Sequence, residues 1–454
     1  MTDQPGPARP VPVALEGATL EQYLAFGFVP RYDAEDPLEL LSRWSRRPRR
    51  GVDDVTLADL VDEGVRALRA AVAECAAQGP GTGEQVVFLS GGLDSRTILA
   101  SLLEVFDRSE IVAATFGLPG EQDFDFAAMV AKEAGVRHEV LESSAVEWTT
   151  QGLVDSVLAR RVPMPAPVGQ RYLSYVLHHR IGKDNTFWDG LSGDVIGGFM
   201  APREGEVWDW PSAIEAFLAF HHGPQYRWLT SPGFEPHAAL PDAPFCSPEV
   251  LAYPDQLMVG IRQRCYTMTR ILPDFTVRTP FLAGPWLDFI LSAPVRYRQD
   301  QYLYREIQKQ AFPALFSLPT TKLHGGAVVE SRWVRTARHL RQRARRTMPG
   351  ARPAPGEALP GRGANAAIRK RYREPGPLRD LVEENIADLA ARGVIGWTDV
   401  RAALPGGGAP QSDSVVTRLV GLEINLKAAD QAAAAAATTL VAPAARGGRH
   451  ARRR

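Results

Sequence analysis

The hexapeptide Ser90-Gly91-Gly92-Leu93-Asp94-Ser95 carries the residue types best suited to chemistry in this 454-residue sequence. It follows the apolar run 85–89, which predicts a buried strand, and leads into the helical pattern of residues 95–106. The N-terminus of a helix offers unpaired N–H groups and a partial positive charge, and glycines let those amides approach an anion closely. With the two serine hydroxyls as further donors, the hexapeptide predicts a phosphate-binding loop.

Asp94 is the unexpected member of this loop, because a carboxylate repels a phosphate. Its presence is explained if Mg²⁺ lies between the two, since Mg²⁺ prefers one or two carboxylates together with phosphate oxygens. The alternative is a glycine-rich turn in which Asp94 simply caps the helix. The position of the complete hexapeptide between strand and helix favours the phosphate site, and no Gly-Lys-Ser/Thr follows, so the loop is not a Walker A motif.

The hexapeptide resembles the pyrophosphate-binding loop of the PP-loop ATP pyrophosphatases, which have an adenine nucleotide α-hydrolase-like fold. That superfamily includes asparagine synthetase, GMP synthetase, NAD synthetase and several tRNA-modifying enzymes. Its members cleave ATP to AMP and pyrophosphate while they adenylate a substrate oxygen. The resemblance implies that the pyrophosphate of ATP is bound by Ser90, Gly91, Gly92, Asp94 and Ser95.

Further stretches resemble the asparagine synthetase family in particular. They follow the family's order over residues 80 to 325, with a weaker echo at 415–428. The resemblance implies that ATP and Mg²⁺ are the cofactors and that the adenosine contacts Leu89, Phe116, Gly117 and Gly190. It also implies that Mg²⁺ is held by Asp94 and Asp194. The stretches are Thr115–Gly120, Asp189–Gly198, Arg278–Leu282 with Tyr302–Arg305, and Leu318–Lys322.

Lys322 falls where the resemblance places a catalytic lysine. Only six of the 52 basic residues are lysines, so a lysine in this sequence draws attention. A compact ammonium group suits the stabilisation of negative charge that develops at a reacting centre. The alternative is a solvated surface lysine, which describes most lysines.

Together these residues predict an ATP-dependent, AMP-forming carbon–nitrogen ligase. In this interpretation a carboxylate is adenylated and its acyl group is transferred to an amine or to ammonia. The expected partners are small-molecule or peptide carboxylate and amine substrates, and a separate ammonia-supplying or carrier protein. We expect no membrane partner, and zero net charge from 52 basic and 52 acidic residues argues against nucleic acid.

Several positions depart from the family's pattern. Leu191 stands where the family has an acid/base carboxylate or tyrosine, and Thr276 and Ala283 replace acidic residues. Glutamine-dependent members begin with a glutaminase domain whose nucleophile is the cysteine after Met1. Here residue 2 is Thr and fewer than ninety residues precede the loop, so we expect that domain to be absent. These departures favour amide formation in specialised metabolism over asparagine synthesis.

Two other functions remain open from the sequence. One is a tRNA-modifying PP-loop ATPase that grips RNA with the basic segment 331–373, although aromatic residues that stack on bases are sparse there. The other is a non-catalytic nucleotide-binding homologue, made credible by the three replaced positions. The three cysteines are far apart, which argues against disulfides and zinc and favours a cytoplasmic location.

The elements that must position these residues alternate between strands and helices, which predicts an α/β fold with a doubly wound parallel sheet. We expect strands at 85–89, 111–116, 138–141 and 186–191, helices at 57–75, 95–106, 124–134, 146–160 and 169–181, and a largely helical C-terminal half that includes helices within 378–404 and 415–428. Thr56 is the expected N-cap of the helix at 57–75.

Composition divides the chain further. We expect a linker-like segment at 1–55, an ATP-binding synthetase domain at 56–330 and a basic Pro/Gly/Arg-rich insertion at 331–373. The C-terminal helices of the synthetase domain would occupy 374–430, and a disordered Ala/Arg-rich tail 431–454.

Overall fold

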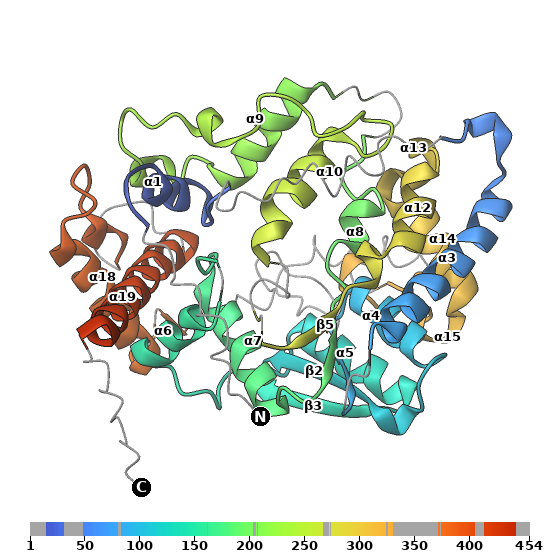
Figure 1. Ribbon diagram of the computed structural model, residues 1–454, viewed down its shortest axis with the longest axis horizontal. Coiled ribbons are helices and arrows are strands. Elements are labelled where there is room, and N and C mark those ends of the chain that lie inside the picture. The colour runs from blue at the N-terminus through green and yellow to red at the C-terminus, as the bar shows by residue number, and fades with distance from the viewer. Residues whose placement is uncertain are drawn as a thin grey trace, which may run out of the picture.

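The structure is a computed structural model that extends over the whole chain (Figure 1). The residues it describes are 15–30, 49–79, 83–160, 162–202, 206, 208–266, 272, 274–323, 326–329, 371–372, 374–404 and 413–441. Most of the predicted basic insertion at 331–373 therefore lies outside the described residues. Among the described residues, no helix is both long enough and apolar enough to cross a membrane.

A five-stranded, all-parallel sheet forms the centre of the fold, in the order β3-β2-β1-β4-β5. The order reverses between β1 and β4, which makes the sheet doubly wound, and the predicted fold class is confirmed. The strands are β1 (Gln85–Phe88), β2 (Ile111–Gly117), β3 (Arg137–Glu142), β4 (Thr186–Trp188) and β5 (Thr276–Arg278). Strand β5 was missed because its three residues, Thr-Val-Arg, form no apolar run.

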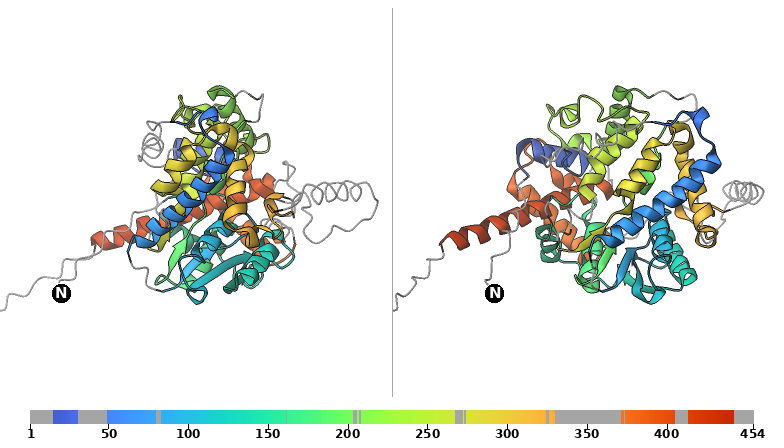
Figure 2. Two further views of the ribbon diagram at one scale, coloured as in Figure 1. Left: turned by 90° about the vertical axis from the view of Figure 1, so that its right-hand side faces the viewer. Right: turned by 45° about the vertical axis from the view of Figure 1, so that its right-hand side comes forward.

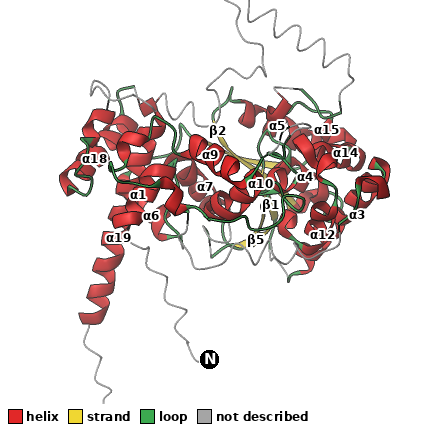
Figure 3. Ribbon diagram, turned by 90° about the horizontal axis from the view of Figure 1, so that it is seen from above, coloured by secondary structure: helices red, strands yellow, loops and turns green. Residues whose placement is uncertain are grey.

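Two hydrophobic cores cover the two faces of this sheet. Val86 and Val87 are neighbours in β1 but belong to different cores, because successive side chains of a strand point to opposite faces. The core containing Val87 is formed with α3 (Leu57–Ala77), α4 (Asp94–Leu102), α5 (Gln122–Ala134), α12 (Gly284–Ser292) and α14 (Tyr302–Ala311). The core containing Val86 is formed with α1 (Gly17–Phe26), α6 (Thr150–Leu158), α7 (Val168–Ile181), α18 (Pro377–Arg392) and α19 (Asp413–Val441). Figure 3 shows these helix groups on either side of the strands.

Helix α3 illustrates how the sequence specifies this packing. Apolar residues recur every three or four positions and form its buried face, and the Thr56 hydroxyl caps its start by accepting the N–H of Asp59 at 3.2 Å. At Gly64 an added Cβ would lie 2.3 Å from Ile307 of α14 and 2.9 Å from Phe289 of α12. Glycine at this position therefore lets the three helices pack closely.

The C-terminal half is largely helical, as predicted. Its remaining helices are α8 (Gly193–Ile196), α9 (Trp210–His221), α10 (Tyr253–Leu257), α13 (Val295–Arg298) and α15 (Pro313–Phe316), joined by 3₁₀ turns. The segment 15–30 also packs tightly, because five of the ten residues of α1 are buried.

The predicted disordered tail at 431–454 is wrong for its first part. Helix α19 continues to Val441, and its C-terminal end projects from the body of the molecule (Figure 2). Alanine has the highest helix propensity, so the run of alanines after Gln431 extends a helix that packing has already established. Residues 442–454 lie outside the described residues. The other domain boundaries remain predictions.

Candidate active site at the carboxyl edge of the sheet

The hexapeptide, called the phosphate loop below, lies at the carboxyl end of β1 and leads directly into α4. The Oγ of Ser95 accepts the N–H of Ser90 at 3.1 Å, and the Oγ of Ser90 accepts the N–H of Gly92 at 3.2 Å. These bonds fold the loop around its own hydroxyls. Helix α4 begins at Asp94 with no side-chain cap, so its first amides remain available to an anion.

Residues 320–322, called the clamp segment below, hold this loop in place although they are distant in sequence. The carbonyl of Gly91 accepts the N–H of Thr321 at 3.0 Å and the hydroxyl of Thr320 at 2.8 Å. A Cβ on Gly91 would lie 2.8 Å from the Thr321 methyl group, so the close approach requires glycine. The clamp places Lys322 next to the phosphate loop.

Arg96 binds the residues that directly precede the clamp segment. Its side chain is completely buried and donates to the carbonyls of Leu315 at 3.2 Å, Leu318 at 3.1 Å and Pro319 at 2.7 Å. Burial lowers the pKa of Arg96 to about 10, which leaves the guanidinium charged at neutral pH. Sequence analysis did not identify Arg96 as a site residue, although an arginine one position after the phosphate loop was a visible signal.

Asp94 points from the phosphate loop towards the loop that follows β4. A Cβ on Gly193 would lie 2.8 Å from Oδ1 of Asp94, and the same oxygen accepts the Tyr304 hydroxyl at 3.0 Å. Burial and the nearby carboxylate of Asp194 raise the pKa of Asp94 well above its usual value, against the opposing effects of Lys322 and Tyr304. The site therefore favours a cation beside Asp94.

Lys322 joins the two loops. Its Nζ lies 3.1 Å from Oδ2 of Asp194 and 4.3 Å from the centre of the Phe199 ring. The side chains of Lys322 and Asp194 are 33% and 21% exposed, so the pair lines an accessible surface where a ligand can reach it. The structure thus brings together Asp94, Asp194 and Lys322, which are separated by about 100 residues or more in the sequence.

A third carboxylate, Asp123 at the start of α5, also belongs to this site. It accepts the N–H of Gly91 and the hydroxyl of Thr321, and burial raises its pKa against these hydrogen bonds and the charge of Lys322. Asp123 therefore ties the phosphate loop to the clamp segment. Asp123 was not among the site residues predicted from the sequence, although it lies three residues after the resembling stretch Thr115–Gly120.

The four residues predicted to contact adenosine all lie at the same edge. Phe116 and Gly117 end β2, Leu89 follows β1 and Gly190 follows β4. The N–H of Leu89 donates to Ala114 at 2.8 Å and its carbonyl accepts the Thr115 hydroxyl at 2.9 Å. A Cβ on Gly190 would lie 3.0 Å from the amide nitrogen of Ser95, so this glycine lets the two loops touch.

The replaced family positions differ in their distance from this edge. Leu191 lies in the loop after β4, where its N–H donates to Oδ1 of Asp189 at 3.0 Å. Thr276 begins β5 two residues before its carboxyl end, and Ala283 is buried at the start of α12. Only Leu191 replaces a side chain of the loop that also carries Asp194.

The donor set fits Mg²⁺ together with a nucleotide. No group of three or more His, Cys, Asp or Glu residues able to hold a metal exists within the described part of the chain. Two carboxylates are nevertheless the protein ligands typical of Mg²⁺ when it also binds phosphate oxygens and water. The carboxyl group of Asp94, close to Asp194 and at the uncapped start of α4, fits this requirement.

Comparison with known proteins identifies one matching family over part of the chain. Residues 65–180 match the family model described as asparagine synthase. The matched segment runs from within α3 to the end of α7 and contains the phosphate loop and β1, β2 and β3.

Proposed function

We propose that this protein is an ATP-dependent ligase that adenylates a carboxylate and transfers its acyl group to an amine or ammonia. The match of residues 65–180 to the asparagine synthase family model supports this proposal. ATP would be converted to AMP and pyrophosphate, so the carboxylate oxygen bonds to the α-phosphorus as pyrophosphate leaves. The amine nitrogen then bonds to the acyl carbon as AMP leaves.

The observation that carries this proposal is the placement of Lys322. Three independent groups hold its segment: the carbonyl of Gly91, the carboxylate of Asp123 and the guanidinium of Arg96. A solvated surface lysine would need no such support. We infer that Lys322 stabilises the negative charge that develops on the reacting phosphorus and acyl groups.

The other site residues have complementary roles in the proposal. The hydroxyls of Ser90 and Ser95 and the uncapped start of α4 bind the pyrophosphate portion of ATP, and Gly91 and Gly92 let the backbone of the phosphate loop approach it closely. Asp94 and Asp194 hold Mg²⁺, which supplies positive charge against the leaving pyrophosphate. The segment around Leu89, Phe116, Gly117 and Gly190 receives the adenosine.

The pKa values of the three cysteines favour amide formation over sulfur transfer. Burial raises the pKa of Cys75 to about 11, of Cys246 to about 11 and of Cys265 to about 12, so all three are thiols at neutral pH. None is prepared as a thiolate nucleophile, which disfavours the sulfur transfer of many tRNA-modifying relatives. The replacement at Leu191 supports an acceptor other than that of asparagine synthesis, in specialised metabolism.

The direct test is product analysis. The protein is incubated with ATP, Mg²⁺ and a panel of carboxylates and amines, and AMP, ADP, pyrophosphate and phosphate are measured. The proposal expects AMP and pyrophosphate that depend on one carboxylate, and their loss in Lys322→Ala. Lys183→Ala is the matched control, because Lys183 is a surface lysine paired with Asp274 at 3.1 Å.

The alternatives predict different products. Formation of ADP and phosphate would contradict the proposal. Tight ATP binding with no turnover for any substrate of the panel would favour the non-catalytic homologue. RNA-dependent AMP formation that weakens steeply with salt would favour the tRNA-modifying enzyme.

A further inference from the structure

A cavity of about 280 Å³ lies apart from the phosphate loop, none of whose residues lines it. Four helix ends surround it: the C-terminal ends of α1 and α9 and the N-terminal ends of α7 and α19. Aromatic side chains form much of its wall, including Phe220, Tyr226 and Tyr266, and Arg262 and Arg418 line it as well. Neither arginine has a role in the proposed adenylation.

Arg418 is nearly completely buried at the cavity. Its terminal nitrogens donate to the carbonyls of Leu24, Ala25 and His221, so they cap the ends of α1 and α9. Its guanidinium carbon lies 3.3 Å from the centre of the Tyr226 ring. The remaining donor, Nε, has no hydrogen-bond partner among the residues that the structure describes. Capping the helices therefore uses only part of this side chain.

Arg418 is one of four arginines, with Arg160, Arg171 and Arg262, that we call the arginine cluster. Burial, together with the charge of Arg171, lowers the pKa of the buried Arg160 to about 9. Burial and the charge of Arg262 lower the pKa of the partly buried Arg171, against the opposing effects of Tyr266 and Asp189. Nη1 of Arg160 and Nε of Arg171 are buried atoms that have no hydrogen-bond partner in the described part of the chain. Within the described residues, none of the four arginines forms an ion pair with a carboxylate at 4.0 Å or less.

The start of α7 adds positive character to the same cavity. This 14-residue helix begins at Val168 after Pro167, without a side-chain cap and without an acid in its first turn. Gly169 and Gln170 of that turn line the cavity. Unpaired amides at a helix start attract an anion, and here they face the same cavity as two guanidinium groups.

Of the four arginines, Arg418 and Arg262 line the cavity, the first buried and the second partly buried, and within the described residues neither pairs with a carboxylate at 4.0 Å or less. Burying such charge costs free energy, and a bound anion would offset that cost. Aromatic walls suit an organic anion, because guanidinium groups and apolar groups both pack on ring faces. Arg262 already lies 5.5 Å from the Phe220 ring centre and 5.6 Å from that of Tyr266. A planar carboxylate matches the fork of guanidinium donors.

We propose that this cavity binds a carboxylate of the substrate, other than the one that is activated, on a molecule of amino-acid to dipeptide size. The inference rests on the proposed function for the identity of the occupant as substrate. Two contacts connect the surroundings of the cavity to the segment after β4 that leads to Asp194. The Ser192 hydroxyl donates to Gln263, the neighbour of Arg262, at 2.7 Å, and the charge of Asp189 raises the pKa of Arg171. Arg262 of the cavity wall is therefore adjacent in sequence to a residue that bonds to Ser192, which directly precedes α8 and Asp194.

The test measures binding without ATP. Hippurate, which joins a carboxylate to an aromatic ring, and its neutral amide hippuramide are titrated by calorimetry into wild type, Arg262→Gln and Gln170→Glu. Hippurate should bind wild type at least tenfold more tightly than hippuramide does, and each variant should lose at least tenfold in hippurate affinity. Gln170→Glu places an acid in the first turn of α7, which favours the helix and repels the anion.

Arg180→Gln is the control, because Arg180 lies on the surface beside Glu139, and it should bind hippurate as wild type does. Equal binding of hippurate and hippuramide, no binding of hippurate, or variants within twofold of wild type would overturn the inference. Inorganic phosphate that binds more tightly than hippurate would also overturn it. Product analysis with ATP is independent: ADP formation would defeat the proposed function and leave the binding result standing.

Discussion

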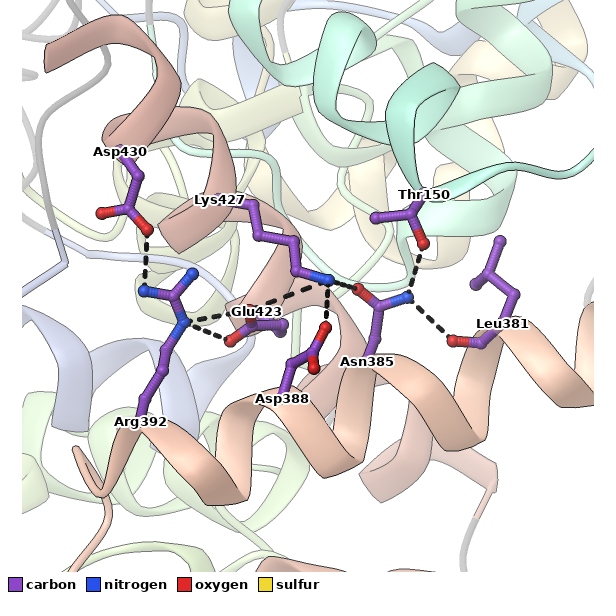
Figure 4. Close-up of polar contacts among 8 residues, drawn as sticks. All are labelled: Thr150, Leu381, Asn385, Asp388, Arg392, Glu423, Lys427 and Asp430. Atoms are coloured by element: carbon purple, nitrogen blue, oxygen red, sulfur yellow. Dashed lines mark hydrogen bonds and ion pairs between the residues drawn. The ribbon is translucent and has the colours of Figure 1, made fainter. Parts of the chain in front are cut away.

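Two groups of charged residues balance their charge differently. One is the network of Arg392, Glu423 and Lys427 between α18 and α19, called the α18–α19 network, and the other is the proposed active site around Asp94, Asp194 and Lys322, called the catalytic edge. In the network, the fully buried carboxylate of Glu423 accepts Nε of Arg392 at 2.8 Å and lies 4.0 Å from Lys427 (Figure 4). Arg392 also contacts Asp430 at 2.8 Å and Lys427 contacts Asp388 at 2.6 Å, so each charge has an opposite neighbour. At the catalytic edge, the three carboxylates of Asp94, Asp123 and Asp194 share Lys322.

This difference separates structural charge from functional charge. A network whose charges are matched within the protein holds two helices together and needs no ligand. A site with surplus charge of one sign is incomplete until a ligand of the other sign binds. The catalytic edge has surplus negative charge and suits Mg²⁺, whereas the arginine cluster has surplus positive charge and suits a carboxylate.

The largest effect should come from removing surplus charge at the catalytic edge. Asp94→Asn keeps the size of the side chain but removes the proposed Mg²⁺ ligand, and we expect AMP formation to fall at least ~1000-fold, or about 4 kcal/mol of activation free energy. The ligand-free protein should become more stable, because a buried carboxylate with a raised pKa is replaced by a neutral amide. Rate assays and thermal unfolding measure the two effects.

Asp155→Asn provides the control, since Asp155 lies on the surface of α6 and its Oδ1 accepts Nε2 of Gln151 at 2.8 Å. It should change neither the rate nor the unfolding temperature appreciably. If Asp94→Asn instead lowered stability and left the rate unchanged, Asp94 would be a structural residue like those of the α18–α19 network.

Breaking the network should have the opposite pattern. Arg392→Met leaves Glu423 buried with only the more distant Lys427, and we expect a loss of about 3 kcal/mol of unfolding free energy with an unchanged rate of AMP formation. Denaturant titration measures the loss. Adding Glu423→Gln should restore most of it, because the unpaired buried charge is then gone. A double variant no more stable than Arg392→Met would contradict this account.

The pH dependence of stability should also report on Glu423. Burial raises its pKa, although Arg392 and Lys427 act against this shift and Asp388 reinforces it. In the unfolded chain the carboxyl titrates near pH ~4.3. The stability that the protonated form contributes is present below that pH and is lost as pH rises through the higher folded pKa, at up to ~1.4 kcal/mol per pH unit. Wild type should therefore lose unfolding free energy relative to Glu423→Gln as pH rises above ~4.

Site residues could be predicted from the sequence when the residues they act with are close to them in the sequence. The phosphate loop was predictable because its glycines, hydroxyls and strand–helix context are contiguous, and Lys322 because lysine is rare in this chain and falls within a resembling stretch. Arg96 and Asp123 were missed as site residues because their partners, Leu318 and Thr321, lie about 200 residues away. The arginine cluster was hidden for the same reason, since its members occur among 46 arginines and are brought together only by packing.

The smallest effect should come from an exposed pair on the same helix as Arg392. Arg379 lies 2.7 Å from Glu383 one turn later in α18, and the two side chains are 33% and 41% exposed. Water screens this pair, so we expect Arg379→Met to cost only about 0.5 kcal/mol in denaturant titrations, and less at high salt. A loss comparable to that of Arg392→Met would mean that α18 is stabilised by charge along its whole length, and not chiefly by the buried contact with Glu423.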